Sequence, residues 1–181
     1  CNVHICIYID KQGQWIEGSI PEQILKEGSI PKSIMASSQC QVIGPHNISK
    51  VIQEVEIWFP VMHGPNGEDG SIQGFFKLTG KPFVGSGILG SSLGMDKIAM
   101  KMAFASANLP QVKYCSTEAE ELINPHKHSL LIEQIEAQLG YPCFVKPANL
   151  GSSVGITKAY NKQQLIEGLE IAANHDPRIV V

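Results

Sequence analysis

The stretch "FVKPANLGSSVGITK", residues 144–158, combines apolar residues, a lysine and a glycine-serine turn. Its apolar residues predict a strand that carries Lys146, followed by a glycine-serine turn and a second strand. Turn amides and hydroxyls can surround a phosphate, and a strand lysine can hold another phosphate as a point charge. A Walker loop is excluded, because GxxxxGK[ST] is absent and a strand, not a helix, follows the turn. Taken alone, such a hairpin is more commonly structural than ligand-binding.

A second glycine-rich segment, "VMHGPNGEDGSIQG", occupies residues 61–74. Before it, the β-branched and aromatic residues of 54–62 predict a central strand of an α/β sheet. After its glycines, the apolar spacing of 71–79 predicts a helix that ends at Gly80. The segment is therefore expected to connect the end of a strand to the start of a helix.

Two features of this connection are suited to binding. His63 is predicted to lie at the carboxyl end of the strand, where open α/β sheets place ligand-binding groups. Residues 67–70 precede the helix, whose unpaired N–H groups and dipole favour an anion. A plain helix cap by Asp69 or Ser71 explains the same residues equally well.

The sequence changes character at "GSGILGSSLG", residues 85–94, which we interpret as a linker with a domain boundary near residue 88. A helix is predicted directly after it, starting with Met95-Asp96-Lys97. Lys97 and Lys101 share one face of this helix. We expect Lys101 to lie on the surface, whereas Lys97 could belong to a surface pair or to an anion site.

The remaining pattern alternates strands with helices, which predicts an α/β or α+β fold. The predicted strands lie within 112–116, 143–146, 154–159 and 179–181, and the helices within 118–139 and 162–173. No metal site is predicted, because His126 and His128 lack a third ligand nearby.

The composition narrows the possible partners. The 181 residues carry a net charge of -3 and are 43% hydrophobic, with scattered lysines and no long apolar run. A nucleic-acid surface and a membrane span are therefore not expected. The five cysteines form no CxxC pair, which favours a reducing cytoplasm over a disulfide framework. The chain opens on Cys1 and closes on a strand-like run, so we interpret it as an internal piece of a longer polypeptide.

Three motifs, taken in order, resemble the D-alanine:D-alanine ligases of the ATP-grasp superfamily. They are HGxxGEDGxxQG, GSxxxxSSxxMDKxxxK and FVKPAxxGSSVGxxK, and the similarity covers residues 55–181, with a looser fit before residue 55. Ser92 stands where the family commonly has alanine, and Met62 where it commonly has leucine.

The resemblance implies a fold of separate domains. Residues 1–88 would form an amino-terminal, Rossmann-like preATP-grasp domain with a parallel sheet, lacking its first strand. Residues 89–181 would form the small central ATP-grasp domain, truncated at the adenine hinge. The carboxy-terminal ATP-grasp domain would be absent, so the chain would be incomplete at both ends and inactive alone.

The resemblance also implies an activity. ATP would phosphorylate the carboxylate of one D-alanine, and the amine of a second would displace phosphate to give D-alanyl-D-alanine for peptidoglycan synthesis. Mg²⁺ or Mn²⁺ would be required, with ligands beyond Val181, and the enzyme would be a cytoplasmic homodimer. The alternatives are a D-alanine:D-lactate ligase, another ATP-grasp carboxylate-amine ligase, or a non-catalytic nucleotide-binding module.

The family's site residues carry over onto matching positions. Lys97 and Lys146 would contact the ATP phosphates, and Phe144 would lie near the adenine. His63 would lie close to the substrate carboxylate and the transferred phosphoryl group. Glu68, Asp69 and Gly70 would shape the loop that supports this substrate. A flexible loop would close over the triphosphate, and Ser152 in this loop would also face the substrate. The loop consists of Gly151, Ser152, Ser153, Val154 and Gly155.

Overall fold

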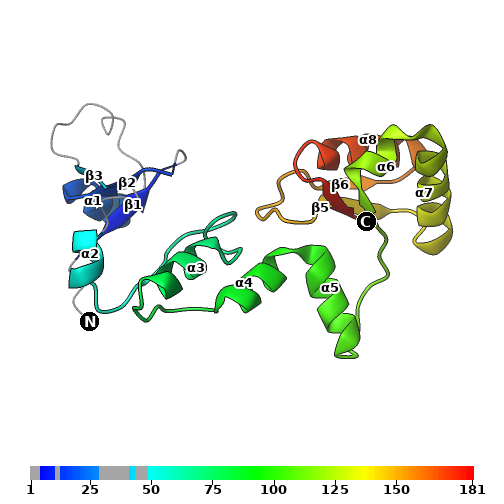
Figure 1. Ribbon diagram of the computed structural model, residues 1–181. Helices are drawn as coiled ribbons and strands as arrows, with labels where there is room; N and C mark the ends of the chain where they lie inside the picture. The colour runs from blue at the N-terminus through cyan, green and yellow to red at the C-terminus, as the bar shows by residue number, and fades with distance from the viewer. Residues whose placement is uncertain (1–4, 11–12, 29–40, 44–48) are drawn as a thin grey trace. The chain divides into compact units, whose positions relative to one another are not determined.

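The computed structural model describes residues 5–10, 13–28, 41–43 and 49–181 (Figure 1). The chain divides into two compact units, residues 1–58 and 59–181. The domain boundary near residue 88 stays a prediction.

The first unit is built on a small sheet of three strands, β1 (Ile7–Ile9), β2 (Trp15–Glu17) and β3 (Gln41–Ile43), in that order. Helix α1 (Ser19–Glu27) follows β2, and helix α2 (Ser49–Glu54) ends the unit. Buried side chains at Trp15, Ile16 and Ile20 lie in β2 and α1. These apolar residues hold the sheet and α1 together.

The described strands of this unit are antiparallel, so the prediction of a parallel sheet is wrong for them. The reason is the short connection between β1 and β2. The Gly13 amide donates to the Asp10 carbonyl at 3.0 Å, and Gly13 has a φ of 78°, which closes a hairpin. Parallel neighbours would need a crossover of roughly a dozen residues.

The strand predicted over 54–62 is also not formed. Residue Glu54 belongs to α2, and of residues 55–62, all of which are described, only Trp58 makes a β-bridge. The side chains still alternate as in a strand, since Trp58 is 7% exposed while Ile57 and Phe59 are 56% and 71% exposed. A strand also requires a neighbouring backbone to complete its hydrogen bonds, which the pattern alone does not supply.

The second unit begins with three helices, α3 (Ser71–Leu78), α4 (Ile88–Met95) and α5 (Lys97–Ser106). The predictions of α3 and α5 are confirmed. Helix α4 corrects the interpretation of 85–94 as a linker, because most of that segment is helical. Glycine and serine disfavour helices in isolation, but their small side chains allow close packing, and α4 packs against α3.

The second unit ends in a four-stranded antiparallel sheet in the order β4-β7-β5-β6. These strands are β4 (Ser116–Glu118), β5 (Cys143–Pro147), β6 (Thr157–Ala159) and β7 (Arg178–Val180). The mixed α/β class predicted from the sequence is therefore confirmed.

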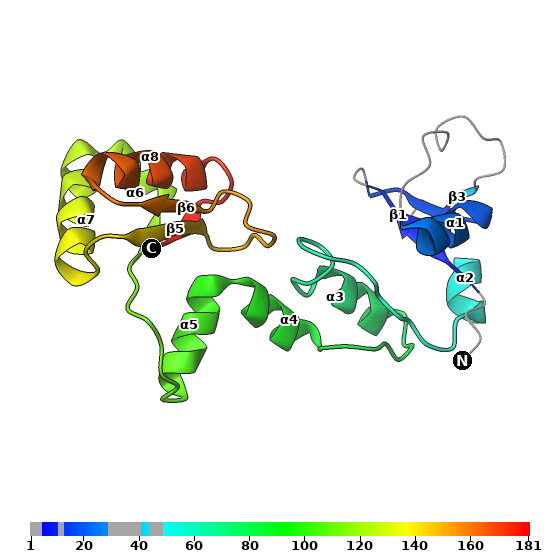
Figure 2. The same ribbon diagram turned by 180° about the vertical axis from the view of Figure 1, so that it is seen from behind.

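Three helices accompany this sheet: α6 (Ala119–Ile123), α7 (Pro125–Gln138) and α8 (Lys162–Ala173). Helix α8 runs across β5 and β6 (Figure 2). Its close approach depends on Gly168, where an added Cβ would lie 3.1 Å from the Val145 side chain. The core contains fully buried Ile135, Leu165 and Ile179. The opposite face of β5 and β6 is left free of this core.

Candidate active site

The amino end of α5 is attached to the segment that follows β5. Asp96 caps the helix by accepting hydrogen bonds from the Ile98 and Ala99 amides, both at 2.9 Å. The Lys97 amide donates to the Ala148 carbonyl at 3.0 Å. The Lys97 ammonium donates to the Leu150 carbonyl at 2.5 Å and to the Ala148 carbonyl at 3.3 Å. Lys97 therefore lies directly beside the loop that begins after β5.

Lys97 and Lys146 are close enough to affect each other electrostatically. Burial lowers the pKa of Lys97, and the positive charge of Lys146 lowers it further, against the opposing effect of Asp176 and Asp96. Neighbouring ammonium groups repel each other, and an anion bound by both would relieve the repulsion. The structure thus brings together the two lysines for which the sequence predicted phosphate contacts.

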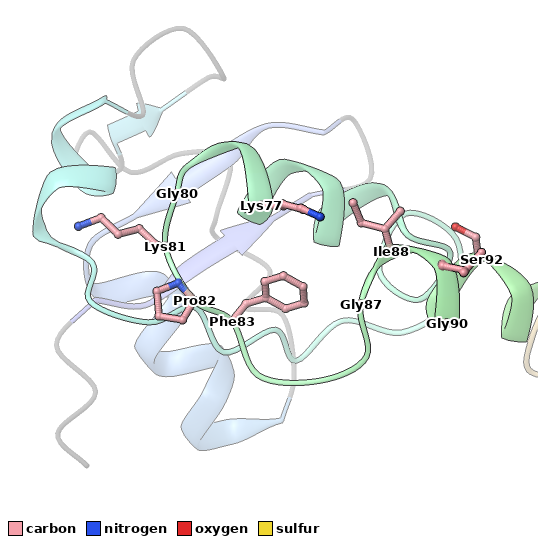
Figure 3. Close-up of a pocket in the computed structure, with 10 residues that line it drawn as sticks. Lys77, Gly80, Lys81, Pro82, Phe83, Gly87, Ile88, Gly90 and Ser92 are labelled. Carbon is pink, nitrogen blue, oxygen red and sulfur yellow. The ribbon is translucent and has the colours of Figure 1, made fainter.

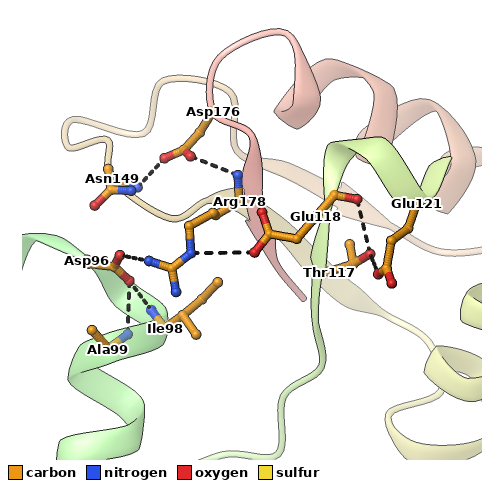
Figure 4. A network of polar contacts seen from close by, with 9 residues as sticks. All are labelled: Asp96, Ile98, Ala99, Thr117, Glu118, Glu121, Asn149, Asp176 and Arg178. Atoms are coloured by element: carbon orange, nitrogen blue, oxygen red, sulfur yellow. Dashed lines mark hydrogen bonds and ion pairs between the residues drawn. The ribbon is translucent and has the colours of Figure 1, made fainter. Parts of the chain in front are cut away.

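A network of charged residues fixes this arrangement (Figure 4). The Arg178 guanidinium donates to the Asp96 carboxylate and lies 3.8 Å from Glu118. Asp176 accepts from the Asn149 amide at 2.6 Å and from the Arg178 amide at 2.8 Å. The network therefore joins α5, the loop after β5 and the start of β7.

No sequence pattern indicated Arg178, Asp176 or Asn149 as site residues. Arg178 and Asp96 are 82 positions apart, and no spacing rule connects them. The only signal was that Asp96 stands at a helix start, as a capping residue would.

Phe144 lies on the uncovered face of β5, with 47% of its surface exposed. The Lys146 ammonium lies 5.8 Å from the centre of its ring. This places an apolar ring beside the lysine pair, a combination that suits a planar base attached to phosphates.

The glycine-serine loop has an unusual backbone. Ser152 and Ser153 have φ values of 52° and 61°, in the left-handed region that costs an L-residue about 1 kcal/mol. Both serines and Val154 are exposed. The Val154 amide donates to the Gly151 carbonyl at 3.2 Å. The loop therefore presents its hydroxyls to solvent beside Leu150, which binds Lys97.

Gly155 ends this loop, and a side chain there would be strained and would overlap its neighbours. Its φ is 68°, and an added Cβ would lie 2.6 Å from the His175 ring and 2.8 Å from Pro147. We expect Gly155→Ala to lower the free energy of unfolding by about 2 kcal/mol, since it combines backbone strain with overlap. Gly151→Ala is the matched control, because nothing lies within 4 Å of its added Cβ. Thermal unfolding of both variants tests this; equal melting temperatures would contradict it.

The loop at 63–70 is held by its own acids. Glu68 accepts from the Gly64 amide at 2.5 Å and lies 4.0 Å from the exposed His63 ring. Asp69 accepts from the amides of Asn66 and Ser71 at 2.8 Å and 2.9 Å. Burial raises the pKa of Asp69, but these hydrogen bonds outweigh it and the pKa is lowered. The geometry supports a loop-shaping role for both acids.

This loop is also fastened to α4. The Ser92 hydroxyl donates to the Asp69 carbonyl at 2.7 Å. Gly70 has a φ of 96°, and an added Cβ would overlap Ser92 and approach the Ile88 carbonyl to 3.0 Å. Among the described contacts, however, none joins His63 to Ser152, Lys97 or Lys146, so the shared site of these residues stays a prediction.

A separate pocket of about 920 Å³ lies beside α3 and α4 (Figure 3). Its lining includes Lys77, Phe83 and Ile88, and Phe83 packs against Phe76 with ring centres 5.8 Å apart. It contains none of the predicted site residues. This pocket and the lysine pair are thus different features.

Among the described residues, no group of three or more His, Cys, Asp or Glu could hold a metal ion. The described residues therefore offer no such cluster for Mg²⁺ or Mn²⁺. None of the described helices is long and apolar enough to cross a membrane.

Comparisons with known proteins show which family the chain resembles. Residues 2–86 match the family model for the D-Ala-D-Ala ligase N-terminus, and residues 103–181 match the model for the D-Ala-D-Ala ligase C-terminus. A D-alanine–D-alanine ligase from a strain of Prochlorococcus marinus is 58% identical over 178 residues, covering 98% of this chain and 50% of the relative. One from a strain of Synechococcus is 51% identical over 181 residues, covering 97% and 50%.

Solved structures give the same result. The VanG D-Ala:D-Ser ligase from Enterococcus faecalis is 31% identical with a TM-score of 0.73, covering 97% of this chain and 51% of that one. The D-alanine-D-alanine ligase from Coxiella burnetii, at 23% identity and a TM-score of 0.71, shares the fold; 96% of this chain and 51% of that one are covered. The chain spans about half the length of the relatives it matches. By its sequence and its fold, the chain belongs to the D-alanine–D-alanine ligase family.

Proposed function

We propose that this chain forms part of an ATP-dependent ligase that joins two D-alanines, and that it supplies the contacts to the ATP phosphates. The observation that carries the proposal is the meeting of Lys97 and Lys146 beside the 151–155 loop. Two ammonium groups and a loop with exposed hydroxyls suit a triphosphate. The names of the relatives support D-alanine as the substrate.

The proposed reaction has two steps. A carboxylate oxygen of the first D-alanine attacks the γ-phosphorus of ATP, the bond to the bridging oxygen breaks, and ADP leaves. The amine of the second D-alanine then attacks the acyl carbon, the carbon-oxygen bond to phosphate breaks, and the amine loses a proton. Phosphorylation is needed because a free carboxylate is a poor electrophile with a poor leaving group.

The lysines serve the first step. Negative charge on the transferred phosphoryl group must be held in place and neutralised, which is the main work of phosphoryl-transfer enzymes. Lys97 is fixed at a helix end, and Lys146 lies on a strand, so both ammonium groups start from anchored backbone. We propose that the phosphates replace the Leu150 and Ala148 carbonyls as partners of Lys97.

The two loops serve binding and closure. We propose that residues 151–155 close over the triphosphate, with Ser152 reaching the substrate, and that Phe144 contacts the adenine. His63 would lie by the substrate carboxylate, while Glu68 and Asp69 keep its loop in shape. Mg²⁺ or Mn²⁺ is expected from the family, but no step is assigned to it because the described residues lack a ligand set. The homodimer and the cytoplasmic location stay predictions.

A second acceptor is the strongest alternative, because one relative of known structure is a D-Ala:D-Ser ligase. Release of ADP by the full-length ligase should be measured with D-alanine alone, then with D-lactate, D-serine or L-alanine added. We expect D-alanine alone to sustain turnover and to give D-alanyl-D-alanine. Turnover that does not depend on D-alanine would contradict the proposal, and faster ligation of D-serine would change the acceptor.

A further inference from the structure

The uncovered face of the β5–β6 hairpin carries a row of alternating cationic and aromatic side chains. Cys143, Val145 and Ala159 point into the core and are 6%, 0% and 0% exposed. Phe144 is directly opposite Lys158 in the register, so both lie on the other face. Tyr160, just after β6, is 60% exposed. The hairpin thus has one buried face and one face that carries two aromatic rings and two lysines.

Lys158 lies between the two rings. Its ammonium is 5.5 Å from the centre of the Phe144 ring and 4.9 Å from that of Tyr160. Both distances are within the range of a cation–π attraction. None of the ion pairs among the described residues includes Lys158. Its contacts here are therefore to ring faces, and its charge is not neutralised by an acid.

Lys158 and Lys146 differ in what else they face. Lys146 is among the charges that lower the pKa of Lys97, and Lys158 is not. Lys146 therefore belongs both to the lysine pair and to the Phe144 ring, whereas Lys158 belongs to the rings alone. The Phe144 ring is thus shared by both lysines, while Lys97 is a neighbour of Lys146 and the Tyr160 ring a neighbour of Lys158.

We propose that Lys158 is a positioning residue of the nucleotide site: its ammonium fixes the Phe144 ring as the surface on which the base stacks. The inference rests on the proposed function, because it takes ATP as the ligand. Exposed rings flanked by cations bind nucleobases by stacking, and this contributes substantially to affinity. A nucleic-acid strand is disfavoured as the ligand by the net charge of -3.

The test is calorimetric titration of the full-length ligase with ATP and, separately, with inorganic tripolyphosphate, both without D-alanine. We expect Lys158→Met to raise the Kd for ATP about fivefold, the size of a cation–π contact, and to leave the Kd for tripolyphosphate unchanged. Lys158→Arg should restore ATP affinity, because a guanidinium also stacks on rings. Lys162→Met is the matched control, an exposed lysine at the start of α8, and should change neither constant.

Two results would overturn the inference. Equal weakening of ATP and tripolyphosphate would make Lys158 a phosphate ligand, and unchanged ATP affinity would make its ring contacts incidental. Lys146→Met should weaken both ligands, which checks that tripolyphosphate occupies the lysine pair. The titration contains no D-alanine, so it measures ATP binding independently of ligation. An enzyme that binds ATP but does not ligate D-alanine would contradict the proposed function, and the role of Lys158 could still be tested.

Discussion

Replacing Lys146 by methionine in the full-length ligase is expected to lower kcat/KM for ATP about 1,000-fold, in line with losing one donor to developing charge. Methionine replaces the apolar part of the lysine side chain with one of similar length and removes the ammonium, so the packing of β5 should be kept. Lys97 would remain, but a single ammonium would face the phosphates. Steady-state ADP release at varied ATP measures the loss.

The matched control is Lys101→Met. Lys101 lies one turn after Lys97, and its ammonium is 4.7 Å from the centre of the Tyr114 ring. Lys101→Met should leave kcat/KM for ATP within about twofold of the unmodified enzyme, because the half-buried Lys101 contacts Tyr114 and lies outside the proposed phosphate site, where substitutions have small effects. A Lys146→Met enzyme that kept its ATP kinetics would remove Lys146 from the phosphate site.

The second large effect is expected at Asp96. Asp96→Ala removes the cap of α5 and leaves the Arg178 guanidinium without its nearest carboxylate. Losing a cap lowers the free energy of unfolding by about 1 kcal/mol, and breaking a partly buried ion pair lowers it further. We therefore expect Asp96→Ala to lower the free energy of unfolding by about 3 kcal/mol. Hydrogen exchange of the Ile98 and Ala99 amides measures the loss of the cap directly, since both amides donate to Asp96.

Asp96→Asn separates the two contributions. Asparagine caps a helix as well as aspartate does, so the Ile98 and Ala99 amides should keep most of their protection. It carries no charge, so the ion pair with Arg178 is lost. Equally fast exchange of these two amides in Asp96→Ala and Asp96→Asn would show that the cap does not hold the start of α5. The cap would then not be what positions Lys97.

Local patterns predicted the helices well and the pairing of strands poorly. Helix α8 was predicted over the residues it occupies, because its apolar spacing and its Asn161 cap are local features. Helix α4 was missed because its glycines and serines disfavour a helix in isolation. What places it is a distant contact, the bond from Ser92 to the Asp69 carbonyl, 23 positions away.

Residues 55–62 show the opposite error. Their alternating side chains are typical of a strand, but pairing depends on which backbone lies alongside. The candidate site divides in the same way. Lys97 and Lys146 belong to sequence motifs, whereas the contact of Arg178 with Asp96 is known only from the structure. The proposed phosphate-binding lysines lie in short motifs, whereas a residue that positions one of them comes from a distant part of the chain.

We propose that this chain serves a ligase that activates D-alanine as an acyl phosphate. The most direct test supplies the full-length ligase with ATP and D-alanine labelled with ¹⁸O in its carboxylate, followed by mass spectrometry of the phosphate released. Because the attacking carboxylate oxygen stays with phosphorus when the amine displaces it, we predict one ¹⁸O atom in each phosphate. Phosphate without label, formed together with dipeptide, would contradict the account.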